Sequence, residues 1–461
     1  MESSLAEMDD IIHRLDIKYV FDCVVAARCC AIVGLSNVGK SYLLRTLSSP
    51  PVYRHFLAET AERFLFVYID FNLMLNLSDQ GFYELILRSI LTKLETLPLS
   101  NDLVAQVHQS YQGIVKPLNL FNASLSFVEG ITAICDHLGR YLVLLCDEFD
   151  EPFYDLDDRV FLNLRALKDR YPQNISYVTA TGQRLRDMRK EHGAAEFSEL
   201  FAHDVHFLRP LERADATTFV EKIIARSDTQ LTSEQKEFLW EQTGGHLGLL
   251  ESSSQALLAA QRDELEGEPI RQLTRRMQQI LDDNLNVRTE CAKLWNSLSG
   301  MEQQVLMQFL AGEFAETHDT TWRSLCEKGI LVRQNDTHWH VFGVLFRDFA
   351  HRQALVKLKS ARGIRMDVDA GTVWVDGNSI PELTSLEYRL LLLLYGNLNK
   401  ICDKYRIVEA VWSEEFLDEV DDARVEKLMS RLRQKIEPDP TQPHYLLTVR
   451  GRGYKLIGPP S

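Results

Sequence analysis

Residues 34–41, GLSNVGKS, follow the pattern G-x-x-x-x-G-K-S. They come after the apolar run 30–33 (CAIV), which predicts a buried strand. They precede residues 42–47 (YLLRTL), whose apolar spacing predicts a helix. A strand, a glycine-rich turn and a helix start together place backbone N–H groups around an anion. This order predicts a phosphate-binding loop in an α/β nucleotide-binding fold with a parallel sheet.

Each residue type in this loop has a chemical role in binding ATP or ADP. Gly34 and Gly39 let backbone N–H groups curl around a phosphate that side chains would obstruct. Lys40 is expected to reach the β- and γ-phosphates, and the Ser41 hydroxyl to hold Mg²⁺. The predicted nucleotide contacts in this segment are Gly34, Asn37, Val38, Gly39, Lys40, Ser41 and Tyr42.

A second apolar run ends in two acids. Residues 141–146 (YLVLLC) have the unbroken apolar character of a buried parallel strand, and Asp147 and Glu148 follow directly. Asp147 is predicted to bind Mg²⁺ through water, and Glu148 to polarise the attacking water. The predicted catalytic residues are therefore Lys40, Asp147 and Glu148. Asp150 and Glu151 follow so closely that the sequence leaves the general base open among these acids.

Further elements complete the predicted sheet. Residues 64–70 and 175–180 are typical of strands, and residues 79–95 of an amphipathic helix. A polar or basic group after the later strand could sense the γ-phosphate. Thr181 and Arg184 are the candidates, with ordinary loop roles as the alternative.

Residues 20 to about 350 resemble the STAND class of signal-transduction ATPases, close to its archaeal-type branch and to Orc/Cdc-like AAA+ proteins. The resemblance rests on the phosphate loop and on the segments DEFD (147–150), LRPL (208–211) and TGGH (243–246). It implies that Pro210 packs against adenine and that His246 lies near the nucleotide. The alternatives are a plain linker turn for Pro210 and a capped helix start for His246.

The same resemblance implies a multidomain chain. Residues 1–210 are expected to form the P-loop ATPase domain and residues 211–285 a helical lid. Residues 286–356 are expected to form a winged helix that clamps the nucleotide cleft shut rather than contacting DNA.

A different composition begins after the polar, basic linker 357–363 (KLKSARG). The segments LTSLE (383–387), VW (411–412), RLRQK (431–435) and TVRGRGY (448–454) appear in order. In this order they resemble the winged helix-turn-helix effector domain of OmpR/PhoB-type response regulators, which implies such a domain at 364–461. Thr384 or Ser385 is predicted to cap its first helix.

The resemblance implies that the third helix of this domain enters the major groove of double-stranded DNA. It places Lys427, Arg431 and Arg433 at DNA-facing positions, with Arg424 near the helix start. It also places Thr448 on a phosphate and Arg450 in the minor groove, while Arg452 adds charge at the wing tip. Residues 423–456 hold eight Lys and Arg against three Asp and Glu. The alternative is a basic face on a winged helix that binds protein.

The chain as a whole is acidic, with a net charge of −15, so DNA contact requires a local basic surface. Its eight cysteines form no C-x-x-C pair or zinc-ligand spacing, which is typical of a reduced cytoplasmic protein. No run of 18 apolar residues occurs, so no membrane partner is expected.

Response regulators carry a phosphorylated receiver domain before the winged helix, whereas an ATPase stands here. The sequence therefore predicts an ATP-dependent switch with sequence-specific DNA binding, a transcriptional regulator controlled by ATP/ADP state. Slow hydrolysis, self-oligomerisation on ATP binding and an unknown activating ligand or protein complete this hypothesis. The alternatives are an origin-recognition or loader-like ATPase, a defence or mobile-element ATPase, and a degenerate scaffold that binds nucleotide without hydrolysis.

Overall fold

The computed structural model divides the chain into two compact units, residues 1–209 and 210–461. It describes residues 11–98, 101–119, 121–227, 230–261, 270–310, 312, 320–334, 338–356, 363–367, 372–375, 378–381, 383–412 and 422–458. Within these ranges, no helix combines the length and the apolar character that crossing a membrane requires. Each unit is described by itself.

The first unit is built on a five-stranded sheet of order β2-β3-β4-β1-β5, and all of its pairings are parallel. Its strands are β1 (Cys30–Gly34), β2 (Phe64–Asp70), β3 (Tyr141–Asp147), β4 (Ile175–Thr181) and β5 (Val205–Leu208). The predicted strands are confirmed. β1, β3 and β4 lie in the interior of the sheet, which explains why their sequences are almost continuously apolar. β2 and β5 form its edges.

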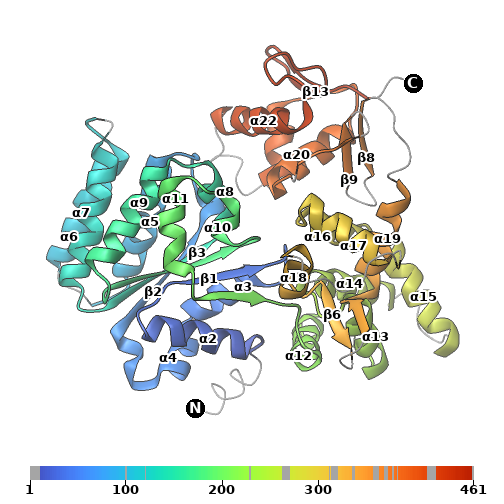
Figure 1. Ribbon diagram of the computed structural model, residues 1–461, viewed down its shortest axis with the longest axis horizontal. Coiled ribbons are helices and arrows are strands. Elements are labelled where there is room, and N and C mark those ends of the chain that lie inside the picture. Colours follow the sequence, from blue (N-terminus) through green and yellow to red (C-terminus); the bar gives the residue numbers. More distant parts are fainter. Residues whose placement is uncertain are drawn as a thin grey trace. The chain divides into compact units, whose positions relative to one another are not determined.

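Helices cover both faces of this sheet (Figure 1). One face carries α2 (Arg14–Val25), α3 (Lys40–Ser48) and α4 (Pro50–Leu57), where Phe66 of β2 packs against Phe21 and Tyr53. The other face carries the larger core. Its helices are α5 (Asp79–Leu94), α6 (Asn101–Val115), α7 (Asn122–His137), α9 (Asp158–Arg170) and α11 (His192–Ser198).

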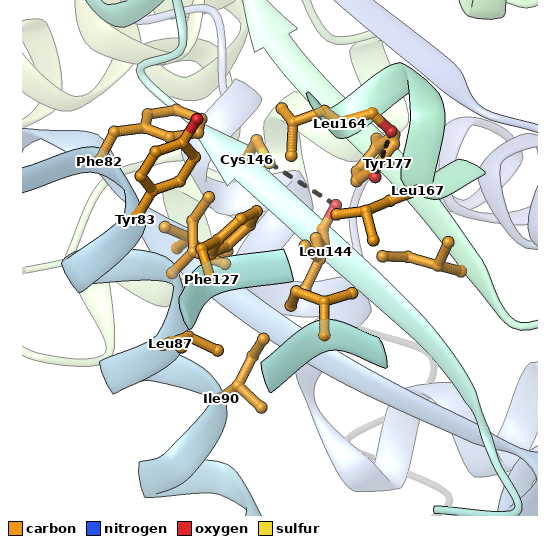
Figure 2. Close-up of a cluster of buried hydrophobic side chains, with 14 of the residues drawn as sticks. Phe82, Tyr83, Leu87, Ile90, Phe127, Leu144, Cys146, Leu164, Leu167 and Tyr177 are labelled. Carbon is orange, nitrogen blue, oxygen red and sulfur yellow. Dashed lines mark hydrogen bonds between the residues drawn. The ribbon is translucent and has the colours of Figure 1, made fainter. Parts of the chain in front are cut away.

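Figure 2 shows part of this larger core, in which Tyr83 and Phe127 stack with ring centroids 4.5 Å apart. Leu144 and Cys146 of β3 point toward these rings, and the Tyr177 hydroxyl donates to the Leu164 carbonyl at 2.8 Å. Because side chains alternate along a strand, Val143, Leu145 and Asp147 must lie on the opposite face, which α3 covers. The core therefore fixes the face toward which the terminal acid of β3 points.

The second unit begins with a helical segment: α12 (Arg213–Ile224), α13 (Ser233–Thr243), α14 (Leu247–Gln261) and α15 (Ile270–Asp283). It continues with α16 (Leu285–Asn296), α17 (Gly300–Leu310), α18 (Thr320–Glu327), the hairpin of β6 (Leu331–Gln334) and β7 (His338–Val341), and α19 (Val344–Val356). The division of this segment into a lid at 211–285 and a winged helix at 286–356 stays a prediction.

Among its described residues, the C-terminal domain has two antiparallel sheets and three helices. β8 (Ile364–Asp367), β9 (Thr372–Val375) and β10 (Asn378–Ser379) form one sheet, and β11 (Ile401–Cys402), β12 (Leu446–Val449) and β13 (Gly453–Leu456) form the other. The helices are α20 (Ser385–Tyr395), α21 (Lys404–Trp412) and α22 (Asp422–Ile436). Thr384 caps α20, since its hydroxyl accepts from the Glu387 N–H and the Glu387 carboxylate accepts from the Thr384 N–H.

Candidate nucleotide site and nucleic-acid interface

The phosphate loop connects β1 to α3 with a backbone that only its glycines permit. Gly39 has φ 118° at the N-cap of α3, a conformation that L side chains rarely adopt. A Cβ on Gly34 would lie 2.9 Å from the Leu208 carbonyl oxygen and 2.9 Å from the Val38 side chain. The N-cap residue Gly39 has no side chain to bond the first N–H groups of α3, which suits an anion at this helix start. The loop therefore has the form of an anion cradle.

Lys40 closes this loop on itself. Its ammonium donates to the carbonyl oxygens of Gly34 at 3.0 Å and of Leu35 at 2.9 Å. Ser41 follows in the first turn of α3 and is half-buried. Val38 is fully buried and anchors the loop, whereas Asn37 is exposed at φ 55° and Tyr42 is half-buried.

The predicted acidic pair, Asp147 and Glu148, lies at the end of β3. Asp147 is 1% exposed, and one of its oxygens, Oδ1, accepts the Glu148 N–H at 3.1 Å. The other, Oδ2, accepts the Tyr68 hydroxyl at 2.6 Å. Glu148 has φ 53°, a left-handed conformation that is costly for a non-glycine residue and that turns the chain out of the strand.

Glu148 lies among charges at the ends of β2 and β3 and at the starts of two helices. Burial raises the pKa of its carboxyl to about 7, Lys40 lowers it, and Asp147, Asp150 and Asp70 raise it further. The side chain nevertheless reaches the surface. A carboxyl with this pKa can exchange a proton near neutral pH, which suits a general base. The structure thus brings together the three predicted catalytic residues Lys40, Asp147 and Glu148.

Asp150 has a structural partner. Its Oδ1 accepts the Gly182 N–H at 2.8 Å, and the Phe149 N–H donates to the Ala180 carbonyl at 3.2 Å. These bonds tie the start of α8 (Asp150–Asp155) to the exit of β4. Because Asp150 already holds the neighbouring loop, Glu148 is the better candidate for the base.

Of the two candidate sensor residues, Thr181 ends β4 and Arg184 follows it. The Thr181 hydroxyl donates to the Gln183 carbonyl at 2.7 Å and is fully buried, so it shapes the turn. The Arg184 guanidinium carbon lies 4.9 Å from the centroid of the Phe207 ring on β5. Neither contact tests a role toward the γ-phosphate, which stays a prediction for both residues.

Pro210 and His246 belong to the second unit. The Leu211 N–H, next to Pro210, donates to the Gly245 carbonyl at 2.9 Å, so the two short motifs containing them are in contact. His246 is fully buried, and its Nδ1 accepts the Leu249 N–H at 3.3 Å, as expected for a capped helix start. Their roles toward adenine remain predictions.

Replacing Glu148 with glutamine should lower ATP turnover about 10²–10⁴-fold, because an amide cannot accept the proton of the attacking water. Nucleotide binding should persist, since the phosphate loop is unchanged. Steady-state phosphate release and equilibrium binding measure the two effects. Glu151→Gln is the matched control and should keep turnover. Full turnover in Glu148→Gln would assign the base to another residue, and absent turnover in the wild-type protein would identify a scaffold without hydrolysis.

Helix α22 of the C-terminal domain has one apolar and one exposed face. Val425, Leu428, Met429, Leu432 and Ile436 are buried in the domain core. The exposed face carries Ala423, Glu426, Lys427, Ser430 and Gln434, and the half-buried Arg431 adjoins it. Ser430 and Gln434 were not predicted from the sequence, although both can form hydrogen bonds with bases. Helical spacing from Lys427 would have indicated them.

The other predicted DNA contacts differ in their surroundings. Arg433 donates to the Leu446 carbonyl at 2.9 Å and to the Thr448 hydroxyl at 2.7 Å, so it joins α22 to β12. The Arg424 guanidinium carbon lies 5.6 Å from the centroid of the Trp412 ring. Arg450 and Arg452 are exposed in the turn between β12 and β13. DNA contact by any of these residues stays a prediction.

No cluster of three or more His, Cys, Asp or Glu that could hold a metal occurs within the described ranges. A nucleotide-associated Mg²⁺ needs no such cluster, because one or two protein oxygens, phosphates and water complete its ligands. The Asp147 carboxylate and the Ser41 hydroxyl are hard oxygen donors of this type. The donor set therefore fits Mg²⁺.

Comparisons with known proteins identify the C-terminal domain. Residues 377–456 match the family "Transcriptional regulatory protein, C terminal". The chain is 38% identical over 107 residues to the uncharacterized transcriptional regulatory protein YcbL of Bacillus subtilis, covering 23% of this chain and 46% of YcbL. It is 38% identical over 95 residues to the sensory transduction protein RegX3 of Mycobacterium tuberculosis, covering 21% and 40%. The chain thus spans less than half the length of these curated relatives.

The larger part of the chain is similar to the Walker-type ATPase PABY2304 of Pyrococcus abyssi, at 13% identity and a TM-score of 0.46. That match covers 74% of this chain and 96% of the other. The fold of the first unit is defined by its parallel strand order and by the glycine-rich loop before α3. The chain thus joins a parallel α/β fold that carries a phosphate-binding loop motif to a domain, residues 377–456, that matches the family "Transcriptional regulatory protein, C terminal".

Proposed function

We propose that this chain is a transcriptional regulator whose sequence-specific DNA binding is controlled by bound ATP or ADP. The observation that carries the proposal is the joining of two modules in one chain. The first unit contains Lys40, Asp147 and Glu148 close together. Residues 377–456 form the domain that matches the transcriptional-regulator family. The position that a receiver domain occupies in response regulators is taken here by a nucleotide-binding fold.

The phosphate loop supplies the binding chemistry. The uncapped start of α3 presents N–H groups to the phosphates, and Lys40 can exchange its two carbonyl acceptors for phosphate oxygens. Ser41 and Asp147 would hold Mg²⁺, which neutralises phosphate charge when bound. Binding would therefore redirect the Lys40 ammonium from these carbonyls to the phosphates.

Glu148 supplies the hydrolytic step. Its carboxylate would orient a water and accept its proton, and its raised pKa lets it do so near neutral pH. Slow turnover would return the protein to the ADP state and reset the switch. For ATP and ADP to change the DNA affinity, the protein must have two conformations that bind DNA differently. ATP must favour one of these conformations more than ADP does.

The DNA-binding step would use the exposed face of α22 and the turn between β12 and β13. The basic residues exposed there are Lys427, Arg450 and Arg452, with the half-buried Arg431 beside them. An acidic chain would otherwise be repelled by DNA, so binding should depend strongly on this one surface and on salt.

The test is to sequence genomic fragments retained by the full-length protein, once with ADP and once with a non-hydrolysable ATP analogue. We expect a small set of sites whose occupancy differs between the two nucleotides. Identical occupancy in both states would refute nucleotide control. Retention without any sequence preference would instead favour a loader-like role, in which the winged helices serve assembly.

A further inference from the structure

The carboxylate of Asp147 accepts a hydrogen bond from the phenol of Tyr68, a residue of the neighbouring strand. The Tyr68 hydroxyl donates to Asp147 Oδ2 at 2.6 Å, while the Glu148 N–H occupies Oδ1. A carboxylate fixed at both oxygens cannot rotate freely, so the lone pairs left for a metal or its waters point in a set direction. The partner on Oδ1 comes from the same strand end, whereas Tyr68 comes from a separate strand.

The register of the sheet explains this contact. Asp70 of β2 pairs with Asp147 of β3, and Tyr68 pairs with Leu145. Residues two apart on a strand share a face, so Tyr68, Asp70 and Asp147 all lie on the face that α3 covers. Tyr68 is half-buried, and its phenol is long enough to reach the diagonal neighbour at the end of β3.

A third group extends the contact to the helix of the phosphate loop. Arg45 Nε donates to the Tyr68 hydroxyl at 3.1 Å, and its guanidinium carbon lies 5.4 Å from the ring centroid. Arg45 follows Ser41 by four residues, about one turn of α3. The hydroxyl accepts from Arg45 and donates to Asp147, so its one proton has a fixed direction.

We propose that Tyr68 is a positioning residue for the Mg²⁺ site, aligning Asp147 with the phosphate-loop helix through Arg45. This inference rests on the proposed nucleotide function. Tyr68 touches neither nucleotide nor metal in this role; it orients the carboxylate that would bind the metal. Groups that orient a metal-binding side chain typically affect metal affinity or activity by about 10–100-fold when removed.

A merely structural role would give a different result, and Tyr141 provides the comparison. Tyr141 begins the strand that Asp147 ends, and its hydroxyl bonds to the Ile175 carbonyl at 2.9 Å and to the Ser176 hydroxyl at 2.6 Å. Tyr68→Phe and Tyr141→Phe each remove one hydrogen-bonded hydroxyl from the same sheet. The first lies beside the last residue of β3, and the second belongs to its first residue. Only the first should affect Mg²⁺.

The experiment measures binding of fluorescent ADP and of a fluorescent non-hydrolysable ATP analogue, first in EDTA and then across a Mg²⁺ titration. In the full-length Tyr68→Phe protein, affinity in EDTA should stay within about twofold of wild type. The Mg²⁺ concentration for half-maximal enhancement of ATP-analogue binding should rise about tenfold. Tyr141→Phe should match wild type in both measurements, even if its melting temperature falls.

Arg45→Gln should raise the half-maximal Mg²⁺ concentration less than Tyr68→Phe does. The double variant should be no worse than Tyr68→Phe alone, because Arg45 reaches Asp147 through Tyr68, while its own ion pair with Asp70 is long at 3.9 Å. An unchanged Mg²⁺ titration in Tyr68→Phe would overturn the inference, as would an equal loss in EDTA. Wild-type protein that binds no nucleotide would overturn the proposed function and this inference with it. The nucleotide-binding curve of the wild-type protein therefore distinguishes a failure of the proposed function from a failure of the inference about Tyr68.

Discussion

Replacing Lys40 with alanine is expected to abolish nucleotide binding. The Lys40 ammonium donates to the carbonyl oxygens of Gly34 and Leu35. With nucleotide it would be the one lysine of the loop available to the phosphates. Removing one member of a desolvated ion pair, here the lysine that would pair with phosphate, costs about 3–5 kcal/mol. The dissociation constant for nucleotide should therefore rise on the order of 100-fold or more. Equilibrium titration with labelled ADP and ATP measures it.

Two controls separate binding from folding in this experiment. Lys190→Ala removes an exposed lysine from the same unit and should leave affinity unchanged. Thermal unfolding of Lys40→Ala should show a small loss, because two loop carbonyls lose a donor but can accept from water. If Lys40→Ala bound ADP as wild type does, the loop would not be a nucleotide site.

The sequence was sufficient to predict elements whose signals are local. The phosphate loop, the apolar strand before Asp147 and the Thr384 cap each depend on residues within one short segment, and the structure confirms their local form. The strand order β2-β3-β4-β1-β5 was not predicted, because strands of similar apolar content differ little in pairing preference.

Tyr68 illustrates what local signals leave out. The strand containing it was predicted correctly, yet nothing in residues 64–70 indicates which residue of β3 lies opposite. The contact with Asp147 depends on the pairing of β2 with β3 and on the face that both side chains share. Arg433 is a similar case: its position in α22 suggested DNA, while its bonds to Leu446 and Thr448 depend on where β12 lies.

Arg431→Ala is expected to weaken binding to a cognate DNA site by about 1–3 kcal/mol, if the guanidinium makes a bidentate contact with guanine. Arg431 is half-buried beside the exposed face of α22. Competition binding against mutated sites should show relaxed preference at one base pair.

Two further arginine variants serve as controls for Arg431→Ala. Arg365→Ala removes an exposed guanidinium from β8, on the other sheet of the same domain, and should change neither affinity nor sequence preference. Arg433→Ala should act through stability, because it breaks the link between α22 and β12; its melting temperature should fall, and its residual binding should keep the wild-type preference.

The pattern across the three variants decides which face of the C-terminal domain meets DNA. A loss with altered preference in Arg431→Ala alone would place the exposed face of α22 in the major groove. A uniform loss with a smaller salt dependence would make Arg431 a phosphate contact, because each neutralised phosphate contributes about 0.9 to the slope of log K against log salt. An unchanged footprint in Arg431→Ala would remove α22 from the interface and favour a protein partner for its exposed face.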